Sequence, residues 1–246
     1  MSKEKILIFI PAYNVEKQIL RVLKRIPTEL FEKYLLSILI IEDCSKDNTK
    51  VIIEDYIKTS SLKDFIKIII NEKNQGYGGV QKIAFDYSIK NNFDYVIMLH
   101  GDDQYKPEKL PEFINTIISN KVDAVFGSRF INPKEPLKGG MPINRYIGNR
   151  VITYIQNLIV GTKMTEFHSG YRCYKVNSLK KINFLKNTND FYFDSEIIIQ
   201  MSKLMQLIKE IPIETIYADE ISNLKPIPYG INVLISTIKY KYFYKD

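Results

Sequence analysis

Two adjacent carboxylates and an amide follow a short apolar segment near the middle of the chain. Residues 94–99 are rich in β-branched and aromatic side chains, which predicts a buried strand, and Asp102, Asp103 and Gln104 come shortly after it. Acids at the carboxyl end of such a strand lie where open α/β sheets bind ligands. Their hard oxygen atoms suit Mg²⁺ or Mn²⁺ shared with the phosphates of a substrate. Alternatively, the two aspartates only form a turn and cap the next helix, and this segment alone leaves both interpretations open.

Other predicted strands also end in polar residues. Buried runs at 5–10, 36–41 and 65–70 lead into three motifs, Pro11-Ala12-Tyr13-Asn14, Glu42-Asp43 and Gly76-Tyr77-Gly78-Gly79. Helical periodicity follows each of these runs, so the pattern predicts βαβ units and a parallel sheet. A parallel sheet gathers the carboxyl ends of its strands at one edge, and we therefore expect these motifs to converge on a single crevice.

Two of these motifs have separable uses. Asp43 is suited to accept hydrogen bonds from a nucleotide base or ribose, and capping of the next helix is the alternative. Gly76 and Gly78 would allow an anion close to the backbone at a helix N-terminus, although a tight turn explains glycines equally well.

The second half of the chain adds cations and acids. Arg129 follows a predicted strand at 122–126 and is suited to bind phosphate, and Arg172 is a second candidate. His168 is either a phosphate ligand or a structural histidine. Asp194 and Glu196 begin a buried helix, where they are candidate general bases or simply favour the helix dipole. Residues 132–140 predict a mobile loop, plausible as a lid.

Composition limits the possible partners and the compartment. The 246 residues carry a net charge of +7, which favours an anionic partner, but no Arg-rich run, zinc pattern or helix-turn-helix motif indicates nucleic acid. We see no apolar run long enough to span a membrane and no signal peptide. Cys44 and Cys173 lack metal spacing, so we expect reduced thiols in a cytoplasmic protein. Lysines alternate with aromatic residues at 239–245, which suits the inner face of a membrane, a dimer contact or docking on the protein's own core.

Six motifs, in this order, resemble glycosyltransferase family 2, the inverting enzymes of GT-A fold. The similarity runs from about residue 6 to 217 and is strongest to the dolichyl-phosphate mannose synthase branch and its bacterial polyprenyl-phosphate relatives. It rests on these motifs: Pro11-Ala12-Tyr13-Asn14, Glu42-Asp43-Cys44-Ser45-Lys46-Asp47, Asn74-Gln75-Gly76-Tyr77-Gly78-Gly79, Gly101-Asp102-Asp103-Gln104, Gly127-Ser128-Arg129 and Ser169-Gly170-Tyr171-Arg172. Three positions depart from the family pattern: His100 replaces the first Asp of Asp-x-Asp, and Asp103 and Cys44 each replace a usual Gly.

The resemblance implies an α/β fold with a Rossmann-like, mostly parallel central sheet flanked by helices. It implies a transferase domain at 1–217, with a nucleotide-binding half at 1–105 and an acceptor-binding half at 106–217, followed by a helical tail at 218–246. The resemblance implies that Pro11, Tyr13 and Asp43 hold the nucleotide, and the full set of candidate nucleotide-binding residues is Pro11, Ala12, Tyr13, Asn14, Asp43, Gly76, Gly78 and Lys82. The implied metal ligands for Mg²⁺ or Mn²⁺ are Asp102 and Gln104. The resemblance implies that Arg129 and Arg172 face the diphosphate or the acceptor's phosphate. The candidate catalytic residues are Asp102, Asp103, Arg129, Arg172, Asp194 and Glu196, and the candidate acceptor-binding residues are His168, Ser169 and Arg172.

The function that follows from the resemblance is inverting transfer of a sugar, of the hexosyltransferase type, from a nucleotide-diphosphate donor to an acceptor. A polyprenyl phosphate is favoured because it is already ionised and the chain is basic. The alternatives are transfer to a saccharide hydroxyl and a sugar-nucleotide-binding subunit with weak catalysis. The donor's base and sugar, the oligomeric state and the pathway stay open.

Overall fold

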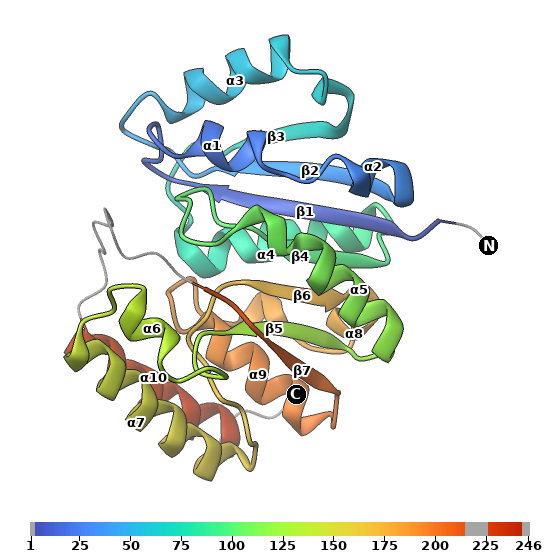
Figure 1. Ribbon diagram of the computed structural model, residues 1–246. Coiled ribbons are helices and arrows are strands. Elements are labelled where there is room, and N and C mark those ends of the chain that lie inside the picture. The colour runs from blue at the N-terminus through green and yellow to red at the C-terminus, as the bar shows by residue number, and fades with distance from the viewer. Residues whose placement is uncertain (1–2, 215–225, 243–246) are drawn as a thin grey trace.

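The computed structural model describes residues 3–214 and 226–242, and it contains one seven-stranded sheet flanked by helices (Figure 1). The strand order is β3-β2-β1-β4-β6-β5-β7, which confirms the predicted α/β architecture with a mostly parallel sheet. The strands are β1 (Lys5–Ala12), β2 (Leu35–Glu42), β3 (Ile66–Ile70), β4 (Tyr95–Met98), β5 (Ala124–Ser128), β6 (Arg172–Lys175) and β7 (Ile208–Pro212).

Helices connect the strands and cover both faces of the sheet (Figure 1). They are α1 (Ile19–Lys24), α2 (Glu29–Lys33), α3 (Thr49–Thr59), α4 (Gly76–Lys90), α5 (Leu110–Asn120), α6 (Glu135–Lys138), α7 (Ile143–Val160), α8 (Val176–Leu179), α9 (Phe193–Lys203) and α10 (Pro226–Tyr242). The amphipathic helix α5 follows a short turn that begins at Pro107, and Pro111 lies in its first turn.

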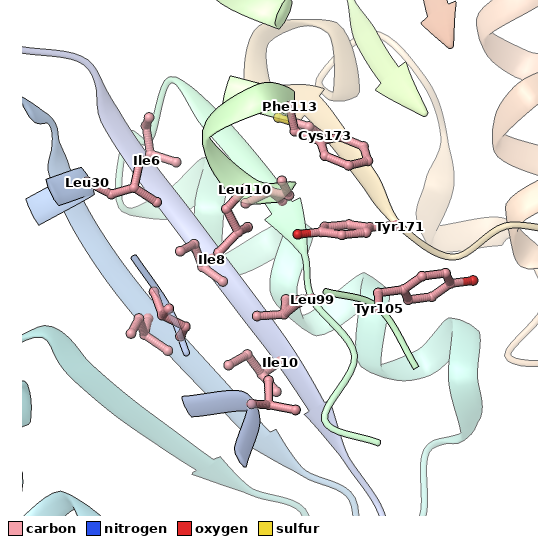
Figure 2. Close-up of a cluster of buried hydrophobic side chains, with 14 of the residues drawn as sticks. Ile6, Ile8, Ile10, Leu30, Leu99, Tyr105, Leu110, Phe113, Tyr171 and Cys173 are labelled. Carbon is pink, nitrogen blue, oxygen red and sulfur yellow. The ribbon is translucent and has the colours of Figure 1, made fainter. Parts of the chain in front are cut away.

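The continuous apolar run of β1 is explained by burial on two sides. Ile6, Ile8 and Ile10 pack into one hydrophobic cluster, drawn in Figure 2, while Leu7 and Phe9 pack into a second cluster on the opposite face. Successive side chains of a strand point to opposite faces, so a central strand covered by helices on both faces needs apolar residues at every position.

The sheet departs from the predicted pattern in its second half. β6 runs antiparallel to both β4 and β5, between which it lies. β7, which the sequence pattern did not predict, pairs in parallel with β5. Its Lys209 and Glu210 and the terminal Pro212 are unlike a buried strand, but an edge strand tolerates charge and proline.

The segment expected as a loop at 132–140 contains the short helix α6, so the expectation of irregular structure is wrong for Glu135–Lys138. Pro136 lies in its first turn and the Lys138 ammonium pairs with the Glu135 carboxylate at 2.8 Å. A helix of one turn is too short to produce periodicity, which explains why the pattern missed it.

The predicted C-terminal helix is present as α10, and it packs against α7 and α9 (Figure 1). The predicted boundary between 217 and 218 and residues 243–246 lie outside the described residues. Within 3–214 and 226–242, no helix has the length and apolar character needed to cross a bilayer.

Candidate active site

The loops that follow β1, β2 and β4 are bonded to one another at the carboxyl edge of the sheet. The Gly101 N–H donates to the Pro11 carbonyl at 3.3 Å, and a Cβ on Gly101 would lie 2.8 Å from that oxygen. The Asn14 N–H donates to Ser45 Oγ at 3.0 Å, and the Asn14 side-chain oxygen accepts from the Lys46 N–H at 2.8 Å. Glycine at 101 therefore allows the loop that carries Asp102 to approach the loop that carries Tyr13.

The segment before β6 reaches the same edge, because β6 runs in the opposite direction to its neighbours. In the sheet register Arg172 is opposite Met98 at the end of β4 and opposite Phe126 near the end of β5. The Gly127 N–H also donates to the Tyr171 carbonyl at 2.8 Å. Asp102 and Arg129 thus follow the ends of β4 and β5, and Arg172 begins β6, which lies between those two strands.

Asp102 keeps its carboxylate partly accessible at this edge. Its Oδ1 accepts from the Gln104 N–H at 3.0 Å, its Oδ2 lies 3.8 Å from His100 Nδ1, and the side chain is 40% exposed. Burial would raise the pKa of Asp102, but His100 and the backbone N–H of Gln104 outweigh it and the pKa lies below its usual value. The carboxylate is therefore ionised at neutral pH, which is the form that a metal ligand requires.

Asp103 points in a different direction from Asp102. Its carboxylate pairs with Arg21 Nε at 3.1 Å and with Arg25 Nη1 at 2.7 Å, which ties the loop to α1. The backbone of Asp103 is left-handed, with φ of 63°, and Cys44 is left-handed as well, with φ of 61°. Both are positions where this sequence departs from a usual glycine, and glycine is the residue that adopts this conformation at least cost.

The donor set fits a divalent cation only in one mode of binding. Among the described residues there is no group of three or more His, Cys, Asp or Glu side chains that could enclose a metal. Mg²⁺ commonly binds through one or two carboxylates together with water and substrate phosphates. Asp102, with the neighbouring Gln104 amide, matches that mode.

Asp43 is fully engaged in positioning the glycine loop. Its buried carboxylate accepts from the Gln75 N–H at 2.8 Å, the Gly76 N–H at 3.1 Å and Asn71 Nδ2 at 2.7 Å. It thus satisfies the first N–H groups of α4, rather than those of the helix that directly follows it.

The glycines of α4 have a packing explanation. The Gly78 N–H donates to the Asn189 carbonyl at 2.8 Å, and a Cβ on Gly78 would lie only 2.4 Å from the Thr188 carbonyl oxygen. Lys82 holds the same segment, because its ammonium donates to the Asn187 carbonyl and to Asn189 Oδ1. The backbone of Thr188 and Asn189 therefore packs against these glycines and leaves no room for a Cβ.

Arg129 and Arg172 are both buried and bonded within the protein. Arg129 forms an ion pair with buried Glu166 through its guanidinium, including Nε at 2.7 Å. Arg172 donates from Nε to the Ser169 carbonyl at 2.7 Å, and from its two terminal nitrogens to the carbonyls of Phe167 at 2.7 Å and Asp194 at 3.0 Å. Both arginines hold the 166–172 segment in place.

The two candidate bases, Asp194 and Glu196, are buried, and each of their oxygens accepts a hydrogen bond from the protein. Asp194 accepts from Tyr77 Oη at 2.7 Å and from Gln81 Nε2 at 3.0 Å. Glu196 accepts from the Thr188 N–H at 2.7 Å and from Ser236 Oγ, on α10, at 2.9 Å.

The remaining acceptor-binding candidates lie on the segment before β6. Ser169 is buried, and its carbonyl holds Arg172. His168 Nδ1 contacts Tyr229 Oη at 2.9 Å, while its Nε2 is buried and has no hydrogen-bond partner among the described residues. Burial, with the nearby charges of Arg129 and Arg172, lowers the pKa of His168 to about 3, so the ring is neutral at physiological pH.

Tyr77 is the residue whose position the sequence pattern did not single out. Its ring stacks on exposed Phe191 with centroids 5.4 Å apart, and lies 6.0 Å from the ring of His100. A Cβ on Gly170 would lie 2.7 Å from Tyr77 Oη and 2.4 Å from His100 Nε2. Tyr77 lies within the motif Gly76-Tyr77-Gly78-Gly79, but the only signal in the sequence was that of the glycines.

Comparison with known proteins decides the family. The profile described as Glycosyl transferase family 2 matches residues 7–183, which include the motifs at all of these strand ends. The chain belongs to glycosyltransferase family 2. It is therefore a glycosyltransferase, as the order of its motifs predicted.

Relatives match along nearly the full length. The chain is 29% identical over 254 residues to a UDP-N-acetylglucosamine–dolichyl-phosphate N-acetylglucosaminyltransferase of Methanococcus voltae, with 100% of this chain and 96% of that protein covered. It is 23% identical over 215 residues to an undecaprenyl-phosphate mannosyltransferase of Micrococcus luteus, with 85% and 82% covered.

Among solved structures, glucosyl-3-phosphoglycerate synthase of Mycobacterium tuberculosis in complex with UDP superimposes with a TM-score of 0.71. The match covers 99% of this chain and 82% of that one, at 14% identity, and it shows a shared GT-A-like fold. The same synthase has been crystallised with Mn²⁺ or Mg²⁺ together with UDP.

Proposed function

We propose that this glycosyltransferase moves a sugar, with inversion, from a nucleotide-diphosphate donor to a polyprenyl phosphate. The observation that carries this proposal is that both candidate bases are buried, so neither is exposed to an incoming hydroxyl. Asp194 and Glu196 are buried, and the protein's own donors bind both oxygens of each carboxylate. A phosphate acceptor needs no such base, because its second pKa lies near 6 and it is already largely ionised at neutral pH.

The relatives support the same acceptor class. Two proteins that the chain matches over most of their length carry names that specify dolichyl phosphate and undecaprenyl phosphate. The first of these names also specifies UDP-N-acetylglucosamine, which makes it the first donor to test.

In the proposed reaction, the donor's nucleotide lies over the loops after β1 and β2, where Tyr13 is 37% exposed and Asn14 is bonded to Ser45. Asp102 and Gln104 would hold Mg²⁺ or Mn²⁺, which supplies a Lewis acid for the leaving diphosphate. Asp43 and Lys82 act on the loop geometry, since their side chains hold Gly76 and Asn189.

The acceptor's phosphate attacks the anomeric carbon from the side of the 166–172 segment. Arg172 binds the carbonyls of that segment and Arg129 binds its Glu166. Both arginines therefore position the segment that faces the acceptor, and neither takes a proton from it. His168 lies on this segment, is half-buried as a residue, and its Nε2 has no hydrogen-bond partner among the described residues, so it is the residue proposed to meet the acceptor.

The test is transfer from labelled UDP-N-acetylglucosamine, and in parallel from UDP-glucose and GDP-mannose, with Mn²⁺ present. Undecaprenyl phosphate, dolichyl phosphate and short saccharides serve as separate acceptors. We expect an acid-labile lipid-linked sugar whose anomeric configuration is opposite to that of the donor. The rate should rise with pH through the acceptor's second ionisation, near 6, and then level off. Transfer to saccharides with none to prenyl phosphate would overturn the proposal.

A further inference from the structure

Helices α7 and α10 are arranged with polar residues inward and apolar residues outward. Gln156 on α7 is buried and donates to Ser195 Oγ on α9 and to Thr237 Oγ1 on α10, both at 3.1 Å. Ser236 on α10 is also buried and donates to Glu196 on α9. A helix that faces water normally buries its apolar stripe, so this arrangement is the reverse of the expected one.

The outward side of both helices is a continuous series of large apolar residues at helical spacing. Tyr154 and Leu158 are 65% and 66% exposed on α7, and Ile235 is 59% exposed on α10. We call these residues the outer face: Ile143, Ile147, Val151, Tyr154 and Leu158 of α7 with Ile231, Ile235, Ile238 and Tyr242 of α10. The two helices pack side by side beyond α9 (Figure 1), and both direct their inward residues toward α9, so both stripes point away from it. Exposed apolar surface of this kind marks an interaction site.

The charge on these helices is of one sign. Neither α7 nor α10 contains an Asp or Glu, while Arg145 and Arg150 lie on α7 and Lys239 and Lys241 on α10. Lysine and arginine beside an apolar stripe with tyrosines match a lipid headgroup region, where aromatic rings lie at the interface and cations meet anionic lipids.

We infer that the outer face of α7 and α10 docks on the surface of an anionic lipid membrane, without crossing it. A second copy of the chain fits less well, because a two-fold contact must be self-complementary. Two such faces would bring positive charges together with no carboxylate on either helix to pair with them.

The membrane surface lies next to the active site. Tyr229, in the first turn of α10, contacts His168 at 2.9 Å, and Glu196 joins the same helix to α9. An acceptor with a lipid tail in the bilayer would therefore present its headgroup near the 166–172 segment. The inference that the outer face docks on a membrane rests on the apolar and basic residues of α7 and α10, and it does not depend on the proposed acceptor.

The experiment is co-sedimentation of the full chain with vesicles of phosphatidylglycerol and phosphatidylcholine in equal parts, and with phosphatidylcholine alone. We expect binding to the anionic vesicles that weakens with salt. The double variant Ile147→Gln/Ile235→Gln should bind about 100-fold more weakly, because two large apolar side chains no longer enter the interface. Lys239→Gln should lose about fivefold on anionic vesicles and nothing on neutral ones.

The matched control is Leu185→Gln/Val51→Gln, which changes two exposed apolar residues outside α7 and α10 and should bind as the unaltered chain does. Circular dichroism and the melting temperature establish that each variant is folded. Vesicle binding unchanged in the double isoleucine variant would overturn the inference. A dimer in light scattering that the isoleucine variant dissociates, with no vesicle binding, would assign the face to a second copy instead. Sugar transfer is measured separately with detergent-dispersed acceptor, so loss of docking and failure of the proposed function are distinct results.

Discussion

The carboxylate of Glu166 accepts hydrogen bonds from both the backbone N–H and the guanidinium of Arg129, and both side chains are almost completely buried. Arg129 was predicted to act on the diphosphate or the acceptor. In the folded chain it has a partner of opposite charge on the segment that carries His168. Two strand-end loops are thereby joined by one ion pair.

Breaking this pair should cost stability. Glu166→Gln leaves the guanidinium buried without its counter-charge, and we expect the free energy of unfolding to fall by about 3–5 kcal/mol in urea titrations. The double variant Arg129→Met/Glu166→Met removes both charges and should recover most of that loss. A stable double variant also separates roles, since it retains activity if Arg129 only positions the loop and loses it if Arg129 touches the substrate.

Substitutions of Asp102 and Asp103 should have different effects, the first on turnover and the second on stability. Asp102→Asn removes the partly exposed carboxylate and should lower metal-dependent donor turnover by about 10²–10³-fold, as loss of one charge-stabilising group does. Asp103→Asn breaks ion pairs to Arg21 and Arg25 that are partly exposed, so its main effect should be about 1 kcal/mol of stability. Equal losses of turnover in the two variants, at matched protein stability, would contradict the assignment of the metal to Asp102.

The glycines of α4 should be required for packing. Gly78→Ala would place a Cβ 2.4 Å from the Thr188 carbonyl oxygen and 2.9 Å from Phe193 Cβ, and we expect destabilisation by about 1–3 kcal/mol. Gly148→Ala is the matched control within a helix, because a Cβ there meets nothing within 4 Å. It should stabilise the chain by up to about 1 kcal/mol through helix propensity. The changes in the free energy of unfolding of both variants are measured by chemical denaturation.

The left-handed backbone at Cys44 predicts a stabilising substitution. Cys44→Gly should raise the free energy of unfolding by about 1 kcal/mol, because glycine adopts this conformation without a steric penalty. Cys44→Ala removes the thiol but keeps a Cβ, so it should give no such gain. If alanine stabilises as much as glycine, the effect belongs to the thiol and not to the backbone.

The buried histidine predicts sensitivity to acid. The pKa of His168 is about 3 in the folded chain, so below the ordinary value of 6.5 the unfolded chain binds a proton that the folded chain does not. The contribution of His168 to the free energy of unfolding is therefore fully present above pH 6.5. It is lost as the pH falls toward 3, at about 1.4 kcal/mol per pH unit. Relative to His168→Gln, the unaltered chain should lose about 2 kcal/mol more between pH 7 and pH 5 in urea unfolding. Parallel pH profiles of the two chains would show that the histidine is not neutral in the fold.

The sequence predicted where the candidate residues lie in the fold much better than it predicted which groups they are hydrogen-bonded to. Continuous apolar runs predicted the strands, because a strand buried on both faces, such as β1, needs apolar residues at every position. The strands in turn predicted that the motifs after them lie at one edge of the sheet. Asp43 was identified as important, but its bond to Gly76 depends on how α4 meets β2, which no local pattern contains. The same holds for Asp194, whose hydroxyl donor Tyr77 lies 117 positions away along the chain. The sequence pattern did not predict β7, because an edge strand with charged residues resembles a loop.

The antiparallel strand β6 has a consequence for how the chain is made. Until residues 172–175 are synthesised, the ladder side of β4 that faces away from β1 has no neighbour, and the hydrogen-bonding groups of Tyr95–Met98 stay open. An uncovered strand edge invites pairing with another chain. A nascent polypeptide that has already completed the first four strands is thus still vulnerable to aggregation, and a fragment cut before β6 inherits that vulnerability permanently.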